Sequence, residues 1–341
     1  MTHCALRLRA AEHAPLYSPP FPPTLAGPLS HPRSLSVARI IAIANQKGGV
    51  GKTTTAVNLA ASLAVAEQRT LLIDGDPQGN ATSGAGLIKE KLDVTVYDVL
   101  IGEATLPDAT ARSVQFKHLD VAPATPDLAG AEVELVGRPN RDQAMRTALE
   151  AIRDNYDYIL IDCPPSLGLI TINMLAAADA LLIPLQCEYY ALEGISQLLN
   201  TVSLVQRSMN EQLSIDGVLL TMYDPRLNLS RQVAADAREF FGTKVYQTVI
   251  PRNVRLAEAP SFGKPIILYD LTSVGAQAYV ELAKEFLERH RQPASSEVAP
   301  VVPIGDAAPE PVISAPSATP DLSDNASLGN HHEHGETSAS R

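Results

Sequence analysis

The chain has 341 residues, of which 45% are hydrophobic and 19% charged, and its formal net charge is −11 at pH 7. This composition excludes a chain that is disordered throughout, and no apolar run is long enough to cross a bilayer. Cys4, Cys163 and Cys187 are an odd number without metal-ligand spacing, so we expect neither disulfides nor a thiolate metal site, and a reducing cytoplasm is the expected location. The first 30 residues lack the continuous apolar stretch of a signal peptide.

The two ends of the chain differ in composition from its middle. Residues 1–36 hold seven of the 26 prolines and a net charge of +2, whereas residues 292–341 hold seven prolines, no aromatic residue and a net charge of −6. Neither end has the apolar surface that would offset the entropy of ordering, so we expect a disordered extension over 1–36 and a disordered acidic Pro/Ala/Ser-rich tail over 292–341. One globular domain, with a net charge of −7, is expected over residues 37–291.

Within residues 37–291, short apolar runs alternate with longer helical patterns, as a parallel sheet with crossover helices requires. The runs are apolar throughout, which is typical of strands covered on both faces. We therefore predict an α/β fold with a mostly parallel, doubly wound sheet. Strands are expected over 40–44, 70–74, 158–162, 180–184, 217–221 and 245–250, and a terminal helix over 274–291.

A glycine-rich loop follows the first predicted strand, with the sequence Asn45-Gln46-Lys47-Gly48-Gly49-Val50-Gly51-Lys52-Thr53-Thr54-Thr55 leading into a helical run over 56–67. Its backbone N–H groups and the start of the helix favour a polyphosphate ligand. By the pattern G-x-x-x-x-G-K-[ST], Lys52 would reach the β- and γ-phosphates and Thr53 would place its hydroxyl on Mg²⁺. Gln46 replaces the first glycine and Lys47 adds a second lysine, so this is a deviant P-loop.

This loop, with the segments Asp74–Asn80 and Asp162–Ser166, resembles the ParA/Soj family of DNA-partitioning ATPases. The resemblance spans most of residues 38–290 and includes the segments 188–194 and 250–261. It implies a deviant Walker A ATPase that uses ATP and Mg²⁺ and forms a dimer around ATP, in which Lys47 of each subunit reaches the phosphates of the other. It also implies a nucleoid-associated dimer on nonspecific double-stranded DNA, released when a ParB-type centromere-binding protein stimulates hydrolysis, for chromosome or plasmid segregation.

Two predicted strands end in aspartate, at Asp74 and Asp162, and Asp76 lies just past the first of these two strands; the carboxyl ends of strands are where ligands bind in an open α/β sheet. Asp162 resembles the Walker B aspartate that holds Mg²⁺, and Asp74 would assist at the metal. Asp76 belongs by resemblance to the first switch, where one carboxylate orients the attacking water. The alternative for all three is capping of a neighbouring loop, and for Asp74 the two interpretations have equal weight.

Adenine recognition is assigned by resemblance to the wider family. Pro251 and the neighbourhood of Met222 would flank the base in an apolar slot. For Met222, packing in the core is an equal alternative. Cys163 adjoins the metal aspartate but is expected to be a small buried hydrophobic residue without chemistry.

Residues 221–264 hold seven basic and four acidic residues, a net charge of +3 inside an acidic domain. By resemblance, Arg226 and Arg255 would hold nonspecific DNA. Binding independent of base sequence is expected because no recognition-helix or zinc-finger pattern is present. The alternative is that these arginines pair with local carboxylates on a solvated face.

Three other function classes fit the sequence less well than partitioning. A MinD-like, membrane-cycling ATPase is opposed by the acidic tail and by the lack of a terminal amphipathic anchor. A reductase component like the nitrogenase iron protein would need paired cysteines for its cluster. A scaffold that binds nucleotide without hydrolysis is not favoured, because Lys47, Lys52, Thr53, Asp76 and Asp162 are all present.

Overall fold

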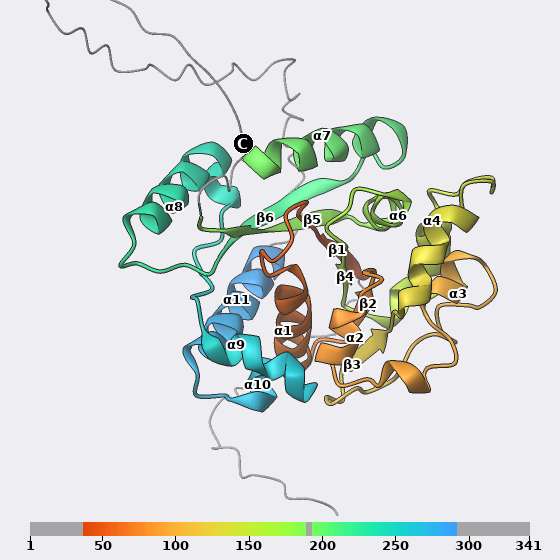
Figure 1. Cartoon of the computed structure of the whole chain (residues 1–341), viewed down its shortest axis with the longest axis horizontal. Helices are drawn as coiled ribbons and strands as arrows, with labels where there is room; N and C mark the ends of the chain where they lie inside the picture. Colours follow the sequence, from red (N-terminus) through yellow and green to blue (C-terminus); the bar gives the residue numbers. More distant parts are fainter. Residues whose placement is uncertain (1–36, 189–192, 292–341) are drawn as a thin grey trace, which may run out of the picture. The chain divides into compact units, whose positions relative to one another are not determined.

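A computed structural model describes residues 37–188 and 193–291. Both predicted terminal extensions, and residues 189–192 within the resemblance at 188–194, lie outside these described residues. In the described part, six parallel strands form one sheet in the order β3-β2-β4-β1-β5-β6, which confirms the predicted α/β fold (Figure 1). The strands are β1 (Arg39–Ile43), β2 (Thr70–Asp74), β3 (Leu119–Ala122), β4 (Tyr158–Asp162), β5 (Ala180–Gln186) and β6 (Ser214–Thr221).

Helices cover both faces of the sheet. Successive side chains of a strand point to opposite faces, and in β1 Ile41 and Ile43 join one apolar cluster while Ile40 and Ala42 join the other. One face is covered by α1 (Lys52–Val65), α2 (Asn80–Gly84), α9 (Val254–Glu258), α10 (Ile266–Tyr269) and α11 (Val274–Arg291). The other is covered by α3 (Val96–Leu100), α4 (Ala131–Glu134), α5 (Ala144–Glu150), α6 (Leu169–Ala177), α7 (Glu193–Ser208) and α8 (Asn228–Phe241).

Helix α1 is buried along most of its length because it packs on the sheet and against α11, which lies beside it (Figure 1). Alanine favours the helix and lets neighbouring backbones approach closely. The hydroxyl groups of Thr55 and Tyr279 lie 3.2 Å apart and join α1 to α11. This packing fixes the helix whose first turn follows the glycine-rich loop.

One strand prediction was wrong, and one strand was not predicted. Residues 245–250 form only isolated bridges next to β6, because the N–H groups of Gln247 and Thr248 donate to the Glu285 carboxylate of α11 instead of to a neighbouring strand. Strand β3 was missed because it is short, lies at the sheet edge and contains Asp120, which breaks the continuous apolar pattern. The predicted terminal helix over 274–291 is confirmed as α11.

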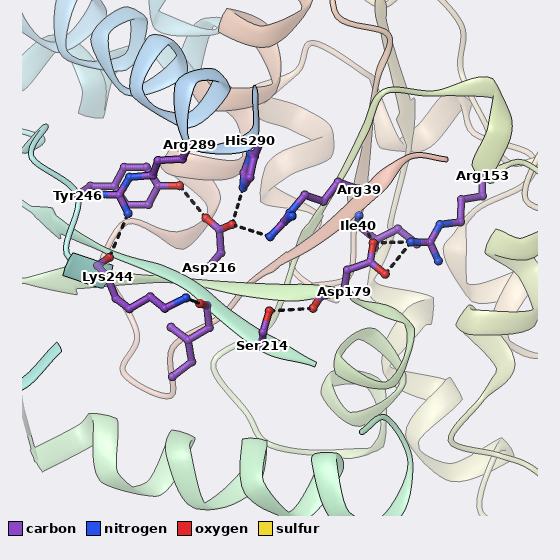
Figure 2. A network of polar contacts seen from close by, with 11 residues as sticks. Arg39, Ile40, Arg153, Asp179, Ser214, Asp216, Lys244, Tyr246, Arg289 and His290 are labelled. Atoms are coloured by element: carbon purple, nitrogen blue, oxygen red, sulfur yellow. Dashed lines mark hydrogen bonds and ion pairs between the residues drawn. The ribbon is translucent and has the colours of Figure 1, made fainter. Parts of the chain in front are cut away.

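The amino-terminal edge of the sheet holds a buried polar network around Asp216 of β6 (Figure 2). Tyr246 donates to one carboxyl oxygen at 2.6 Å, while His290 Nε2 lies 2.7 Å and an Arg39 nitrogen 3.5 Å from the other. Burial opposes the charge on Asp216, but the contacts with His290, Tyr246 and Arg39 outweigh it and lower its pKa. The network attaches the end of α11 to β6 and β1.

No helix in residues 37–188 and 193–291 is long and apolar enough to span a membrane.

Candidate nucleotide-binding site

The carboxyl ends of the central strands bring the predicted site residues together. Strand β4 pairs with β1 and β2, and Asp162 at its end is the register partner of Ile43 on one side and of Asp74 on the other. The glycine-rich loop begins directly after β1, and Asp76 follows β2. Parallel pairing therefore places the loop and all three aspartates at one edge of the sheet.

The glycine-rich loop is held in place by the ends of β5 and β6. Gly51 has a φ of +90°, which favours glycine, and it packs against Thr221. The Thr221 hydroxyl donates to the carbonyl oxygen of Val50 at 2.8 Å, and Asn45 donates to the carbonyl oxygen of Pro184 at 2.7 Å. The sequence analysis did not identify Thr221 as a site residue. The signal was present, because Thr221 is a polar residue at the carboxyl end of a predicted strand, as Asp74 and Asp162 are.

The two lysines of the loop lie in different environments. Lys52 is buried, and its ammonium group donates to the carbonyl oxygen of Lys47 at 3.2 Å. Burial lowers the pKa of Lys52, and the negative charges of Asp162 and Asp76 act in the opposite direction. Lys47 is exposed. The loop therefore holds one cation inside and presents the other to the outside.

Asp162 is fully buried, and neither of its carboxyl oxygens has a hydrogen-bond partner among the described residues. Burial and then the charge of Asp74 raise its pKa, while the nearby Thr53 hydroxyl and Lys52 favour the charged form. Buried polar groups are nearly always satisfied, so these two oxygens call for an explanation. Mg²⁺ fits here, since it prefers carboxylate and hydroxyl oxygens and takes its other ligands from phosphate and water.

The metal would depend on ligands brought by the nucleotide. In the described ranges, no group of three or more His, Cys, Asp or Glu side chains could hold a metal ion by itself. This agrees with the usual Mg²⁺ site of nucleotide enzymes, which has one or two carboxylates together with substrate phosphates.

Asp74 is buried like Asp162, but its oxygens have partners. One accepts hydrogen bonds from the backbone N–H and the hydroxyl of Thr82, both at 2.7 Å, and the other accepts from the N–H of Asp76 at 3.2 Å. Burial raises the pKa of Asp74 to about 6, and these hydrogen bonds limit the rise. Its position fits support of the Asp76 loop better than direct contact with a metal.

Asp76 lies in the loop between β2 and α2, and its side chain is 8% exposed. Its carboxylate accepts a hydrogen bond from the N–H of Gln78 at 2.9 Å, and its carbonyl oxygen accepts one from Gly79. Lys89, which sequence reasoning missed, donates to the carbonyl oxygen of Gln78. No sequence signal marked this lysine, because it lies outside the motif and contacts only the backbone.

Met222 and Pro251, the residues predicted to flank adenine, line one cavity of about 180 Å³. Gly51 and Thr54 of the phosphate loop line the same cavity, whose surface is mostly apolar. Met222 is half-buried with a φ of +51°, so the chain turns sharply after β6. The cavity adjoins the phosphate loop, so a base attached to a polyphosphate in that loop could reach it. Cys163 is buried, as expected, and burial raises the pKa of its thiol.

Arg226 and Arg255 are exposed, and each is paired with local carboxylates. The side chain of Arg226, just before α8, is 87% exposed and binds Asp224 through two nitrogens. Arg255 of α9 lies 2.9 Å from Glu258 and 3.5 Å from Asp270. Both arginines therefore pair with local carboxylates, which was the alternative to DNA binding, and both guanidinium groups also face solvent.

Comparison with known proteins identifies relatives along most of the described chain. The family described as "AAA domain" matches residues 38–215. The Bacillus subtilis sporulation initiation inhibitor protein Soj is 60% identical over 249 residues, which cover 73% of this chain and 98% of the relative. The Myxococcus xanthus chromosome partitioning protein ParA is 56% identical over 254 residues, which cover 74% of this chain and 89% of the relative.

Solved structures agree with this fold. Cobyrinic acid a,c-diamide synthase from Mycobacterium smegmatis, with a bound ATP analogue and magnesium, has a TM-score of 0.65 and 39% identity, covering 74% of this chain and 96% of that chain. The Pyrococcus furiosus cell division ATPase MinD has a TM-score of 0.59 and 31% identity, covering 74% of this chain and 99% of that chain.

Proposed function

The chain belongs to the ParA/Soj family of partitioning ATPases, and on this premise we propose that it is a DNA-partitioning switch operated by ATP. It is an ATPase that uses ATP and Mg²⁺. In the proposed cycle, ATP joins two copies into a dimer, the dimer binds nonspecific double-stranded DNA, and a ParB-type partner stimulates hydrolysis and release. The cargo would be a chromosome or a plasmid.

The observation that carries the nucleotide assignment is the buried carboxylate of Asp162 near Lys52, which has no hydrogen-bond partner in the part of the chain that the structure describes. Thr53 and Asp162 would hold Mg²⁺, which when bound neutralises phosphate charge. Lys52 would stabilise the charge that develops on the phosphates during transfer. The apolar cavity beside Met222 and Pro251 would accept adenine.

Hydrolysis requires a positioned water more than a strong base. Asp76 would orient that water from its loop next to the phosphate site. The exposure of Lys47 supports a contact across the dimer, because a side chain at the loop entrance that faces outward can reach the phosphates of a second copy. A cation from each subunit would then make ATP part of the dimer interface.

DNA binding would use the arginine forks of Arg226 and Arg255, whose geometry matches phosphate oxygens. Exposed ion pairs contribute little to stability, so DNA phosphate can replace Asp224 and Glu258 as the partners of these arginines. Dimerisation doubles the number of such contacts, so DNA affinity would depend on the nucleotide state.

A gel shift on random duplex DNA with ATP, ADP or no nucleotide tests this proposal. We expect a shift only with ATP, a persistent shift for Asp76→Ala, and no ATP binding for Lys52→Ala. Arg255→Glu should weaken DNA binding and flatten its salt dependence while ATPase persists, whereas the control Arg207→Glu, at an exposed arginine on α7, should keep both. A monomeric Asp76→Ala variant in ATP and Mg²⁺ would contradict the cycle.

The likeness to MinD favours a second candidate, a membrane-cycling ATPase. Sedimentation with anionic liposomes in ATP distinguishes the two. Pelleting that depends on ATP, without binding to DNA, would favour the membrane cycle over partitioning.

A further inference from the structure

Thr82 of α2 closes the loop that carries Asp76. Its side chain is fully buried, and both its N–H and its hydroxyl donate to the same carboxyl oxygen of Asp74 at 2.7 Å. The other oxygen of Asp74 accepts the N–H of Asp76. One carboxylate at the end of β2 therefore holds the loop at Asp76 and again at the start of α2.

The Thr82 hydroxyl also connects this loop to β3. It accepts a hydrogen bond from the N–H of Ala124, just after β3, at 2.9 Å. Because that N–H can only donate, the single hydroxyl hydrogen is directed to Asp74. A Cβ at Gly79 of the same loop would lie 2.6 Å from the Ala124 carbonyl oxygen, so the loop backbone packs against this residue.

We propose that Thr82 is a positioning residue for ATP hydrolysis: its hydroxyl fixes Asp74, and Asp74 in turn fixes the backbone of Asp76. This proposal rests on the role of Asp76 in the proposed function. Thr82 itself lines neither of the cavities beside α1, so its effect is transmitted through the two aspartates. Displacing a reacting group by about 1 Å can cost roughly 100-fold in rate, so a small rotation of Asp74 has a large effect.

Thr82→Val tests the hydroxyl, because valine has nearly the same shape but leaves the Ala124 N–H unpaired and Asp74 with one donor fewer. We expect kcat to fall about 10- to 100-fold while KM and the affinity for an ATP analogue change less than about 3-fold. Thr82→Ser retains the hydroxyl and should restore kcat to within about 3-fold of the wild type.

Thr70→Val is the matched control. Thr70 lies at the other end of β2, is fully buried, and its hydroxyl donates to the carbonyl oxygen of Gln68 at 3.0 Å. If the role of Thr70 is structural, Thr70→Val should lower the melting temperature without changing kcat per molecule that binds ATP. If Thr82→Val does not fold, Thr82→Ala is measured in the same way, with kcat normalised to the fraction that binds the analogue.

The proposal is overturned if folded Thr82→Val, or Thr82→Ala in its place, has the wild-type kcat, if Thr70→Val loses as much activity, or if Thr82→Ser fails to rescue. Asp76→Ala separates this failure from failure of the proposed function. An inactive Asp76→Ala beside an active Thr82→Val rejects only the role of Thr82. An Asp76→Ala variant with normal hydrolysis removes the catalytic role of Asp76, and the Thr82 proposal with it.

Discussion

Buried carboxylates at the amino-terminal and carboxyl-terminal ends of the strands differ in their hydrogen bonding. At the amino-terminal edge, Asp216 has contacts to Tyr246, His290 and Arg39 (Figure 2). At the carboxyl ends of the strands, Asp162 is buried more completely than Asp216, yet its oxygens have no hydrogen-bond partner within the described residues. A satisfied buried charge holds elements together, whereas an unsatisfied one is a stability cost that a ligand can relieve.

Asp216→Asn should produce the largest loss of stability. The Asp216 carboxylate has buried polar contacts with Tyr246 and His290, and breaking such a network by changing one member costs about 3 to 5 kcal/mol. For a domain of this size the melting temperature would fall by roughly 6 to 20 °C, measured by calorimetry without nucleotide. ATP hydrolysis per folded molecule should be unchanged. An unaltered melting temperature would show that the network adds no net stability.

Asp162→Asn should have the reverse outcome, a loss of hydrolysis without a loss of stability, and the free-energy change should be slightly smaller. Hydrolysis should fall at least about 100-fold, or about 2.7 kcal/mol, because the carboxylate that would hold Mg²⁺ is lost, and with it the neutralisation of phosphate charge by the metal. The stability of the nucleotide-free protein should stay the same or rise, since an amide is cheaper to bury than a carboxylate. Steady-state ATPase and thermal unfolding of one preparation measure both. If Asp162→Asn were less stable but still active, Asp162 would have the structural role that we assign to Asp216.

The two edges should also respond oppositely to pH. Burial raises the pKa of Asp74 to about 6, so its protonated form stabilises the fold and that contribution is lost as the pH rises through about 6. The pKa of Asp216 is lowered, so its contribution is present above the unfolded pKa of about 4 and is lost as the pH falls through the folded value.

Urea unfolding in EDTA without nucleotide checks this prediction. From pH 5 to 7, the wild type should lose about 1 kcal/mol or more relative to Asp74→Asn, because one pKa unit corresponds to about 1.4 kcal/mol. Below about pH 4, the wild type should lose stability relative to Asp216→Asn. Parallel curves for wild type and Asp74→Asn would mean that Asp74 is not perturbed.

The surface pair of Asp224 and Arg226, in which the arginine is exposed, should show the smallest effect. Asp224→Asn should leave the melting temperature unchanged, because water and salt screen the pair. It should raise the affinity for random duplex DNA about 2- to 5-fold at low salt, since Arg226 loses its competing carboxylate. Fluorescence anisotropy in the Asp76→Ala background with ATP measures this. Equal affinities would place Arg226 outside the DNA surface.

Much of the fold was predictable because its signals are local. Five of the six strands are short apolar runs buried on both faces, and the phosphate loop has glycines at the positions where its backbone turns. Strand β3 was not predictable in this way, since an edge strand with Asp120 lacks that pattern. The segment 245–250 is apolar enough for a strand, but Glu285 of α11 takes two of its N–H groups.

The sequence by itself determined the chemistry of this protein: a glycine loop with two lysines, and aspartates at the ends of predicted strands. Only the tertiary structure decided what each carboxylate does. Asp74, Asp162 and Asp216 all lie in strands, but Thr82 binds the first, His290 binds the third, and the second has no hydrogen-bond partner among the described residues. His290 lies 74 residues from Asp216 in the sequence. Register and helix packing, which are nonlocal, therefore determine which buried charge remains for a ligand.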